Sequence, residues 1–490
     1  MKRKKLAQVL LAGMLAGIGS GSHAVSVSTD GSGQVLIYPY YTARAGYDTV
    51  FTVSNPTGAA KAIRLRFREG RNSRSVLDFN LYLGAKMTWT AGVTANAAGD
   101  PLLRTFDTAC TAPALPPSGI FATARELMFT NVNYANYDKA GSTLDRAMEG
   151  FFELIEMGEI DRNFTLPGGQ ALIEAIAQGN NCNAVAAAWS TGGAFPGSNG
   201  AELTAPTGGL NGGSMIINVQ EGTTFPVEPV ALNALYAGKF HTAPGSASPN
   251  LGNADPRSIV LTAAGNRIES TWDSGIDAVS AVLMHRGVLN EYASTAAGSP
   301  TLVSTDLVLS FPTKGFHVEL ESAGSPTRPP FKSVFRDVTP ASPPPGAPSV
   351  IADGESPGAC EQLLESRYAR SGQANIVSDV FMIQVPYAVV SACWTTTVNA
   401  IGGVFASKNL LSEPGNVNPG DFDRHSRTGQ IEYQMGAQGE FSMVSKEGVE
   451  FTGLPVIGFA ARKYVNGDIG GVRANYGRIG AHKYVSGAPQ

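Results

Sequence analysis

Short strands that alternate apolar and polar residues fill residues 34–93, and this pattern constrains the fold more than any other feature of the chain. In residues 61–68 three apolar residues alternate with Arg64, Arg66 and Arg68, which is the period of a strand with one buried and one solvated face. Similar runs occur at residues 34–42, 48–54, 76–83 and 87–93, and turn-forming residues separate them. This spacing predicts an antiparallel β-sandwich of immunoglobulin-like character.

The rest of the chain combines more β-rich segments with a few short helices. With 57 glycines, 30 prolines and only 16% charged residues, the composition is typical of a loop-rich, mainly β protein. Strands are expected at residues 149–157, 214–219, 305–311, 380–385, 391–398, 441–444 and 456–464. Helices are expected at residues 170–178, 183–189, 276–285 and 360–370. The fold class is therefore mainly β, with β-rich α+β regions after the N-terminal sandwich.

The chain is too long for one hydrophobic core, so several domains are expected. Eight prolines fall between residues 326 and 348, and such a segment forms a stiff linker or a long surface loop. The expected units are a signal peptide (1–24), an immunoglobulin-like sandwich (25–125), an α+β region (126–325), a proline-rich linker or loop (326–358) and a β-rich C-terminal domain (359–490).

The first 24 residues have the pattern of a secretory signal peptide. A basic start at residues 2–5 precedes the apolar residues 6–18 and a run of small residues that ends at Ala24, which predicts cleavage after Ala24. Removing this segment lowers the net charge from −4 to −8, a balance that argues against nucleic acid as a partner. No later run is apolar for 18 residues, so no integral membrane segment is expected in the mature chain.

The four cysteines predict two disulfide bonds in an exported chain. Three pairings are possible, and Cys110–Cys182 with Cys360–Cys393 is favoured because each bond then closes within its own half of the chain. A metal site is not supported, because the sequence has no C-x-x-C pair. No cofactor is expected.

Residues 354–358 match the G-x-S-x-G motif of serine hydrolases, with Ser356 at the nucleophile position. The next residue, Pro357, has no backbone N–H to donate to an oxyanion. Partners for the serine would come from Asp421, Asp423, His425 and His482, which no spacing selects. The motif therefore assigns no catalytic residue.

Acidic residues crowd one stretch of the chain, at Glu149, Glu153, Glu156, Glu159 and Asp161. A solvated face is the favoured interpretation, although paired carboxylates also serve glycosidases. The glycine-rich residues 208–213 lead into a strand rather than a helix, so they are expected to form a turn and not a phosphate-binding loop. The histidines His241, His285, His317, His425 and His482 are scattered without metal-binding spacing.

Three stretches near the N-terminus, QVLIYPYYT (34–42), RFREG (66–70) and VLDFNLYL (76–83), resemble a group of uncharacterised proteobacterial exported proteins that are often labelled cell-surface proteins. Residues 310–314 and 453–459 are similar to later stretches of the same group. The resemblance implies a Gram-negative bacterium and an envelope or extracellular location. It carries no catalytic residues across to this chain.

The leading hypothesis is a secreted or cell-surface protein of structural, adhesion or assembly type, with no evident catalytic site. Its location is the cell surface or the exterior, with the periplasm as an alternative, and its partners are envelope components or polysaccharide. The alternatives are an extracellular polysaccharide hydrolase and a carbohydrate-binding protein. A binding platform for sugars would need exposed aromatic rings, for which Tyr40, Tyr41, Trp89 and Trp272 are the candidates.

Overall fold

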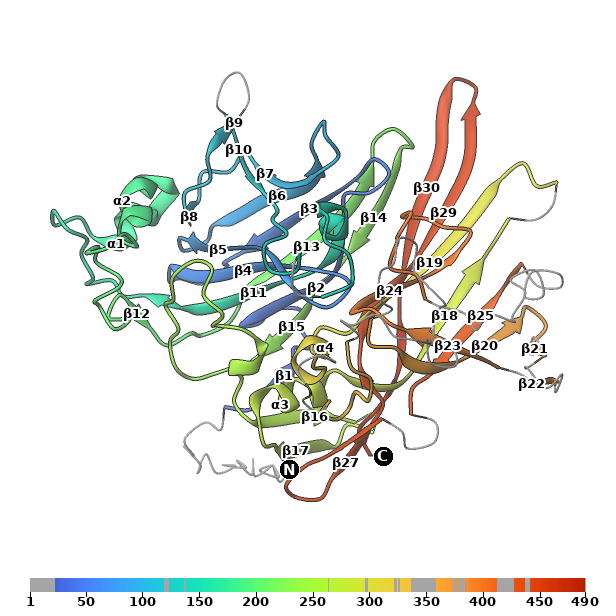
Figure 1. Ribbon diagram of the computed structural model, residues 1–490. Helices are drawn as coiled ribbons and strands as arrows, with labels where there is room; N and C mark the ends of the chain where they lie inside the picture. The colour runs from blue at the N-terminus through green and yellow to red at the C-terminus, as the bar shows by residue number, and fades with distance from the viewer. Residues whose placement is uncertain are drawn as a thin grey trace, which may run out of the picture.

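The chain folds into two antiparallel β-sandwiches that pack against each other (Figure 1). The computed structural model describes residues 23–118, 123–135, 138–262, 264–295, 298–320, 324, 327–335, 358–372, 377–378, 384–385, 387–411, 427–436 and 441–489. Strands dominate the described residues and helices are few and short. The predicted mainly β fold class is confirmed.

Two sheets form the N-terminal sandwich. Sheet 1 has the order β1 (Ser26–Val27), β15 (Val230–Asn233), β2 (Val35–Thr42), β11 (Glu149–Ile160), β4 (Lys61–Glu69), β5 (Ser75–Leu83) and β8 (Cys110–Ala112), and β12 (Leu203–Thr204) pairs with β11. Sheet 2 has the order β14 (Thr223–Val227), β13 (Asn211–Asn218), β3 (Tyr47–Ser54), β6 (Thr88–Ala95), β7 (Pro101–Thr105), β10 (Ala124–Met128) and β9 (Pro117–Ser118).

The core of this sandwich is rich in aromatic rings. Phe67 of β4 stacks on Phe152 of β11 with ring centroids 4.6 Å apart, and Phe51 of β3 contacts both of these rings and Trp89 of β6. These residues are buried, as the alternation in residues 61–68 predicted for its apolar side. An immunoglobulin constant domain has seven strands in total, whereas here each sheet has at least seven strands of its own. The two folds therefore share only the face-to-face packing of two antiparallel sheets.

Two further sheets form the C-terminal sandwich. Sheet 3 has the order β23 (Ala388–Ala392), β20 (Glu361–Ala369), β25 (Thr428–Gln434), β18 (Met284–Ala293) and β28 (Leu454–Pro455), and β31 (Lys483–Ser486) pairs with β18. Sheet 4 has the order β24 (Thr396–Ile401), β19 (Leu302–Ser310), β29 (Ile457–Ile469) and β30 (Val472–Ala481). Two-stranded sheets pair β16 (Arg257–Leu261) with β17 (Arg267–Thr271), β21 (Val377–Ser378) with β22 (Gln384–Val385), and β26 (Ser442–Val444) with β27 (Glu450–Thr452).

Short helices cover the N-terminal sandwich at two places. The helical segments are η1 (Leu144–Met148), α1 (Leu172–Ile176), η2 (Ala177–Gly179), α2 (Cys182–Ala187), η3 (Leu251–Asn253), α3 (Gly275–Val282) and α4 (Lys314–His317). Helices α1 and α2 pack near β8, and α3 packs against the face of sheet 1 that points away from sheet 2. The helices expected within 170–178, 183–189 and 276–285 are thus found, each shorter than predicted.

The helix expected at residues 360–370 is wrong, because this segment forms β20. Its glutamate, glutamine, leucine and arginine residues favour a helix locally. In the folded chain the segment lies between β23 and β25, and its alternate residues Leu363, Glu365 and Arg367 are buried. Pairing with two neighbouring strands therefore overrides the local propensity.

The strand pairing does not follow the domain boundaries expected at residues 125 and 325. Sheets 1 and 2 take β11 to β15 from beyond residue 125, and β11 occupies a central position in sheet 1. Strands β18 and β19 lie before the proline-rich segment 326–358, and they pair with strands that come after it. That segment therefore lies between strands of one sandwich in the chain, and most of it lies outside the described residues.

Residues from both halves interlock where the two sandwiches meet. Tyr40 of β2 packs on Phe405, which follows β24, and on Phe459 of β29. The carboxylate of Glu149 in β11 accepts hydrogen bonds from Ser407 Oγ at 2.6 Å and from the backbone N–H of Lys408 at 2.9 Å. The residues just after β24 therefore fasten the C-terminal sandwich to a buried charge of the N-terminal one.

Candidate functional site

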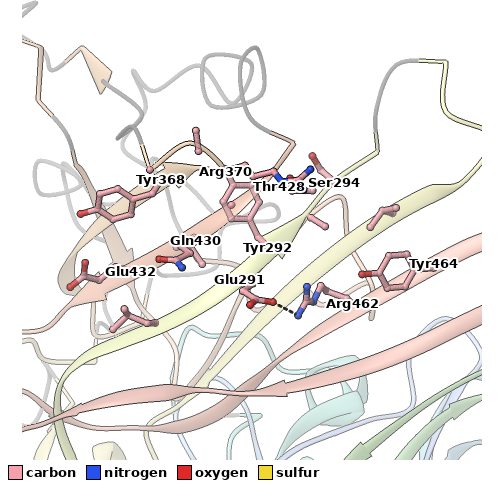
Figure 2. A pocket seen from close by; sticks show the side chains of 17 residues that line it. Glu291, Tyr292, Ser294, Tyr368, Arg370, Thr428, Gln430, Glu432, Arg462 and Tyr464 are labelled. Carbon is pink, nitrogen blue, oxygen red and sulfur yellow. Dashed lines mark hydrogen bonds and ion pairs between the residues drawn. The ribbon is translucent and has the colours of Figure 1, made fainter.

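A pocket of about 800 Å³ opens on the C-terminal sandwich, and β18, β20, β25 and β29 contribute to its lining. We refer to it as the β25 pocket. Figure 2 shows Tyr368 and Glu432 at one side of it and Arg462 and Tyr464 at the other, with Glu291 between them. Ligand sites are commonly concave surfaces of this size with a few convergent polar groups, which makes this pocket the candidate site.

The strand register places three of the lining side chains in one row. Tyr368 of β20 lies opposite Gln430 of β25, and Gln430 lies opposite Glu291 of β18. Directly opposed residues of antiparallel strands share a face, so these side chains project together, whereas Ile431 and Tyr433 of β25 point into the core. Because neighbouring strands lie about 4.8 Å apart, the row spans about 10 Å.

An ion pair links this row to sheet 4. Arg462 Nη2 of β29 donates to Glu291 Oε2 at 2.9 Å. The hydrogen bond and the positive charge of Arg462 lower the pKa of Glu291 below its ordinary value. A general acid of a glycosidase needs a raised pKa instead, so Glu291 is suited to accept hydrogen bonds and not to deliver a proton.

The lining of the β25 pocket offers several kinds of polar contact. Glu291 and Glu432 accept hydrogen bonds, Arg370 and Arg462 donate them, and the amide of Gln430 does both. Tyr368 and Tyr464 are half-buried residues of the same lining. Sequence reasoning did not find this set, because its members come from four strands spread over residues 289–464 and only the register brings them together.

Both predicted disulfide bonds are present, in the favoured pairing. Cys110 of β8 is bonded to Cys182 at the start of α2, 72 residues later, and this bond fastens the helical segment to sheet 1. Cys360 and Cys393 are bonded across the ends of the neighbouring strands β20 and β23. Two such bonds are typical of proteins from an oxidising compartment.

The predicted cleavage site lies at the beginning of the described residues. Ala24 is buried, and the backbone N–H of Val25 donates to the carbonyl of Arg257 at 2.8 Å. The carbonyl of Val25 in turn accepts from the N–H of Ile259 at 2.8 Å. Val25 thus pairs with β16, while residues 1–22 lie outside the described residues.

The expectation that the arginines of β4 form a solvated face is wrong. Arg64 and Arg66 are 0% and 3% exposed, and Asp78 of β5 binds both, at 2.7 Å from Nε of Arg64 and 2.5 Å from Nε of Arg66. Both guanidinium groups also donate to backbone carbonyls in the loop 243–249. This loop covers the face that was expected to meet water, and the arginines hold it there.

The acidic stretch is likewise not a solvated face. Glu149, Glu153 and Glu156 of β11, a central strand of sheet 1, are buried, whereas Glu159 and Asp161 are half-buried. Each buried carboxylate is paired: Glu149 with Arg44 at 2.9 Å, Glu153 with Arg68 at 2.9 Å, and Glu156 with Lys61 at 2.6 Å. These three carboxylates are buried and ion-paired, so none of them is open to a substrate.

The glycine-rich residues before β13 bind an anionic group of the protein itself. The backbone N–H of Gly208 donates to Glu156 Oε2 at 2.7 Å, and that of Thr207 donates to Glu156 Oε1 at 3.1 Å. The buried Lys61 forms an ion pair with the same carboxylate. Burial raises the pKa of Glu156, and the attraction of Lys61 opposes that rise. The turn is therefore occupied by a carboxylate side chain.

The residues considered for a serine hydrolase are only partly described. Ser356, Asp421, Asp423 and His425 lie outside the described residues, so the motif stays untested. His482 is buried, with Nε2 at 2.8 Å from the carbonyl oxygen of Val308. Burial lowers the pKa of His482 to about 4. His482, which directly precedes β31, therefore has a structural role.

A serine, histidine and aspartate that the sequence did not connect do come together elsewhere. Ser280 Oγ of α3 lies 2.8 Å from His317 Nε2 of α4, and His317 Nδ1 lies 4.0 Å from Asp277 Oδ1. Ser280 and His317 are completely buried, and burial lowers the pKa of His317 to about 3. The serine has no access to a substrate, and the histidine is too weak a base to activate it. We therefore interpret these three residues as a packing contact between two helices.

His241 and His285 also have structural roles. His241 is buried and hydrogen-bonded to Glu202 and to the hydroxyl of Tyr82. His285 stacks on Tyr484 with ring centroids 4.0 Å apart. Across the ranges that the structure describes, no three histidine, cysteine, aspartate or glutamate side chains gather to hold a metal ion.

The four aromatic rings named as candidates for a sugar platform are all buried, which counts against a carbohydrate-binding site at these positions. Tyr40, Tyr41 and Trp89 are 0% exposed and Trp272 is 3% exposed. All four lie in apolar clusters, where Trp272, for example, packs on Phe451 of β27. These rings cannot stack on a ligand from solvent.

No helix within the described part of the chain is both long and apolar enough to cross a membrane. A comparison with models of known protein families finds no match to this chain. A search of curated proteins finds no significant similarity either.

Proposed function

We propose that this chain is an exported protein of the bacterial cell surface or exterior, of structural or adhesion type, and that it works by binding. The observation that carries the proposal is the Glu291–Arg462 pair in the β25 pocket. Arg462 holds Glu291 in its ionised form. The open pocket therefore presents fixed charges that can form hydrogen bonds with a ligand.

The construction of the molecule supports an extracellular working place. Each half of the chain is closed by its own disulfide bond, which persists outside the cell and not in a reducing cytosol. Buried contacts such as Glu149 with Ser407 fix the two sandwiches to each other. A rigid scaffold of this kind suits a protein that bears a binding surface, and the resemblance to exported cell-surface proteins agrees with this proposal.

A polysaccharide hydrolase is the second candidate, because Glu291 and Glu432 line the same pocket. The lowered pKa of Glu291 suits only the ionised base or nucleophile of such an enzyme, so a hydrolase would need Glu432 as its general acid. A hydrolase would lose its turnover when Glu291 is changed to Gln, whereas a binding protein has no turnover to lose.

Cell fractionation with protease shaving tests the proposal. Intact cells of the source bacterium are treated with proteinase K, and the chain is detected by immunoblotting in the cells and in the medium, with a periplasmic and a cytoplasmic protein as controls. We expect the protein to be released or shaved from intact cells while both controls survive. Protection of the whole population together with the cytoplasmic control would refute export to the surface.

A further inference from the structure

The β25 pocket has the composition of a site for an uncharged, hydroxyl-rich chain. Two carboxylates, Glu291 and Glu432, and two guanidinium groups, Arg370 and Arg462, line it, so the described lining has no net charge. A pocket built for an anionic polymer would have an excess of cations. Hydroxyl groups both donate and accept hydrogen bonds, and carboxylates, guanidinium groups and an amide together satisfy both needs.

Two tyrosines lie at opposite sides of the β25 pocket. Tyr368 ends the row that continues with Gln430 and Glu291, and Tyr464 lies on the far side near Arg462 (Figure 2). Sugar rings have C–H groups on their faces and hydroxyls on their edges. A ring that packs on Tyr368 would therefore present its hydroxyls to the polar side chains of the same row.

We propose that the β25 pocket binds a neutral oligosaccharide segment, which stacks on Tyr368, donates hydrogen bonds to Glu291 and Gln430, and accepts them from Arg462. This inference rests on the proposed function as an exported binding protein and names its ligand class. The row of about 10 Å across three strands fits a stretch of a few sugar units. The buried Tyr40, Tyr41, Trp89 and Trp272 have no part in it.

Binding of unbranched neutral hexasaccharides of glucose and of N-acetylglucosamine to the purified full-length protein tests this inference, with a sulfated hexasaccharide as the charged comparison. We expect saturable binding of a neutral chain. Tyr368→Ala or Gln430→Ala should weaken it roughly tenfold, which corresponds to about 1.4 kcal/mol. Tyr476→Ala serves as the matched control, because Tyr476 is 60% exposed on β30 and does not line the pocket. The affinity of this variant should stay within about twofold of that of the unchanged protein, well below the roughly tenfold loss expected of the pocket variants.

The variants should unfold at the same temperature as the unchanged protein, because the three side chains lie at the surface or in the pocket. Failure to bind either neutral chain, binding of the sulfated chain alone, or equal affinities of the Tyr368→Ala variant and the unchanged protein would each overturn the inference. The purified protein is used, so these results do not depend on export. A protein that is shaved from cells but binds no sugar refutes the ligand class alone, and a sugar-binding protein that stays inside refutes the proposed location alone.

Discussion

Asp306 of β19 is a buried acid between the two sandwiches, and its titration should make stability depend on pH. The side chain is 0% exposed, and its Oδ2 accepts a hydrogen bond from the N–H of Phe405 at 2.9 Å. Lys463 attracts its charge and Glu149 repels it, while burial is the largest influence and raises the pKa to about 6. The change Asp306→Asn removes this titration and keeps an acceptor for Phe405.

The magnitude follows from the difference between the folded and unfolded pKa values. The ordinary pKa is 3.8 and the folded value is about 6, which corresponds to about 3 kcal/mol at 1.36 kcal/mol per unit of pKa. The folded state binds the proton more tightly than the unfolded state does. The contribution of Asp306 is therefore complete below about pH 4, is lost between about pH 4 and pH 6, and stays constant at higher pH.

Thermal unfolding of the full chain between pH 4 and pH 8 measures this effect. The unfolding midpoint of the unchanged protein should fall relative to that of Asp306→Asn by about 3 °C as the pH rises from 4 to 6.5, for a cooperative unit of this size. Asp273→Asn is the control, because the Asp273 side chain is 90% exposed, and its curve should run parallel to that of the unchanged protein. A constant offset would reflect only the new amide, so parallel curves for Asp306→Asn would refute the reasoning.

Three further changes test the buried contacts. Lys61→Met should lower the free energy of unfolding by about 3–5 kcal/mol, because Glu156 is left buried without its partner, and adding Glu156→Gln should recover much of this loss in denaturant titrations. Replacing Cys110 and Cys182 by serine should lower the same quantity by about 2–5 kcal/mol, as measured under non-reducing conditions. Arg64→Ala should release the loop that its guanidinium holds, which limited proteolysis would detect as new cleavage in residues 243–249; an unchanged digestion pattern would contradict that role.

Local patterns were sufficient to predict the strands of residues 34–93, whereas several later strands, such as β18, β25 and β30, were not predicted. The alternation in residues 61–68 corresponds to β4, and the apolar run at residues 34–42 corresponds to β2. The cysteine pairing was predicted because chain distance alone favours it. In each case the deciding information lies within one segment or in the spacing of the cysteines along the chain.

Which face meets water was not predictable in the same way. Two residues of β4, Lys61 and Arg68, pair with Glu156 and Glu153 of β11. Arg64 and Arg66 pair with Asp78 of β5, and a loop from residues 243–249 covers them. A half-polar strand has the same sequence pattern whether its polar side meets water or an opposite charge. The expected domain boundary at residue 125 was misplaced for a related reason, since β11 inserts between β2 and β4 from a distance.

The β25 pocket was out of reach for the same cause. Tyr368, Gln430 and Glu291 are far apart in the sequence. They become neighbours only through the pairing and register of their strands, which the sequence pattern does not reveal. The segment that contains Tyr368 was even expected to be a helix. No single motif marks the site.

The contact between Glu149 and residues 407–408 has a consequence for the order of folding. These partners are separated by 258 and 259 positions in the chain, so the N-terminal sandwich cannot complete the shell around this buried charge until nearly all of the chain is present. An early, fully independent folding of the first half is therefore disfavoured. Under the export proposed above, the two halves would close on each other only after the chain has crossed the membrane.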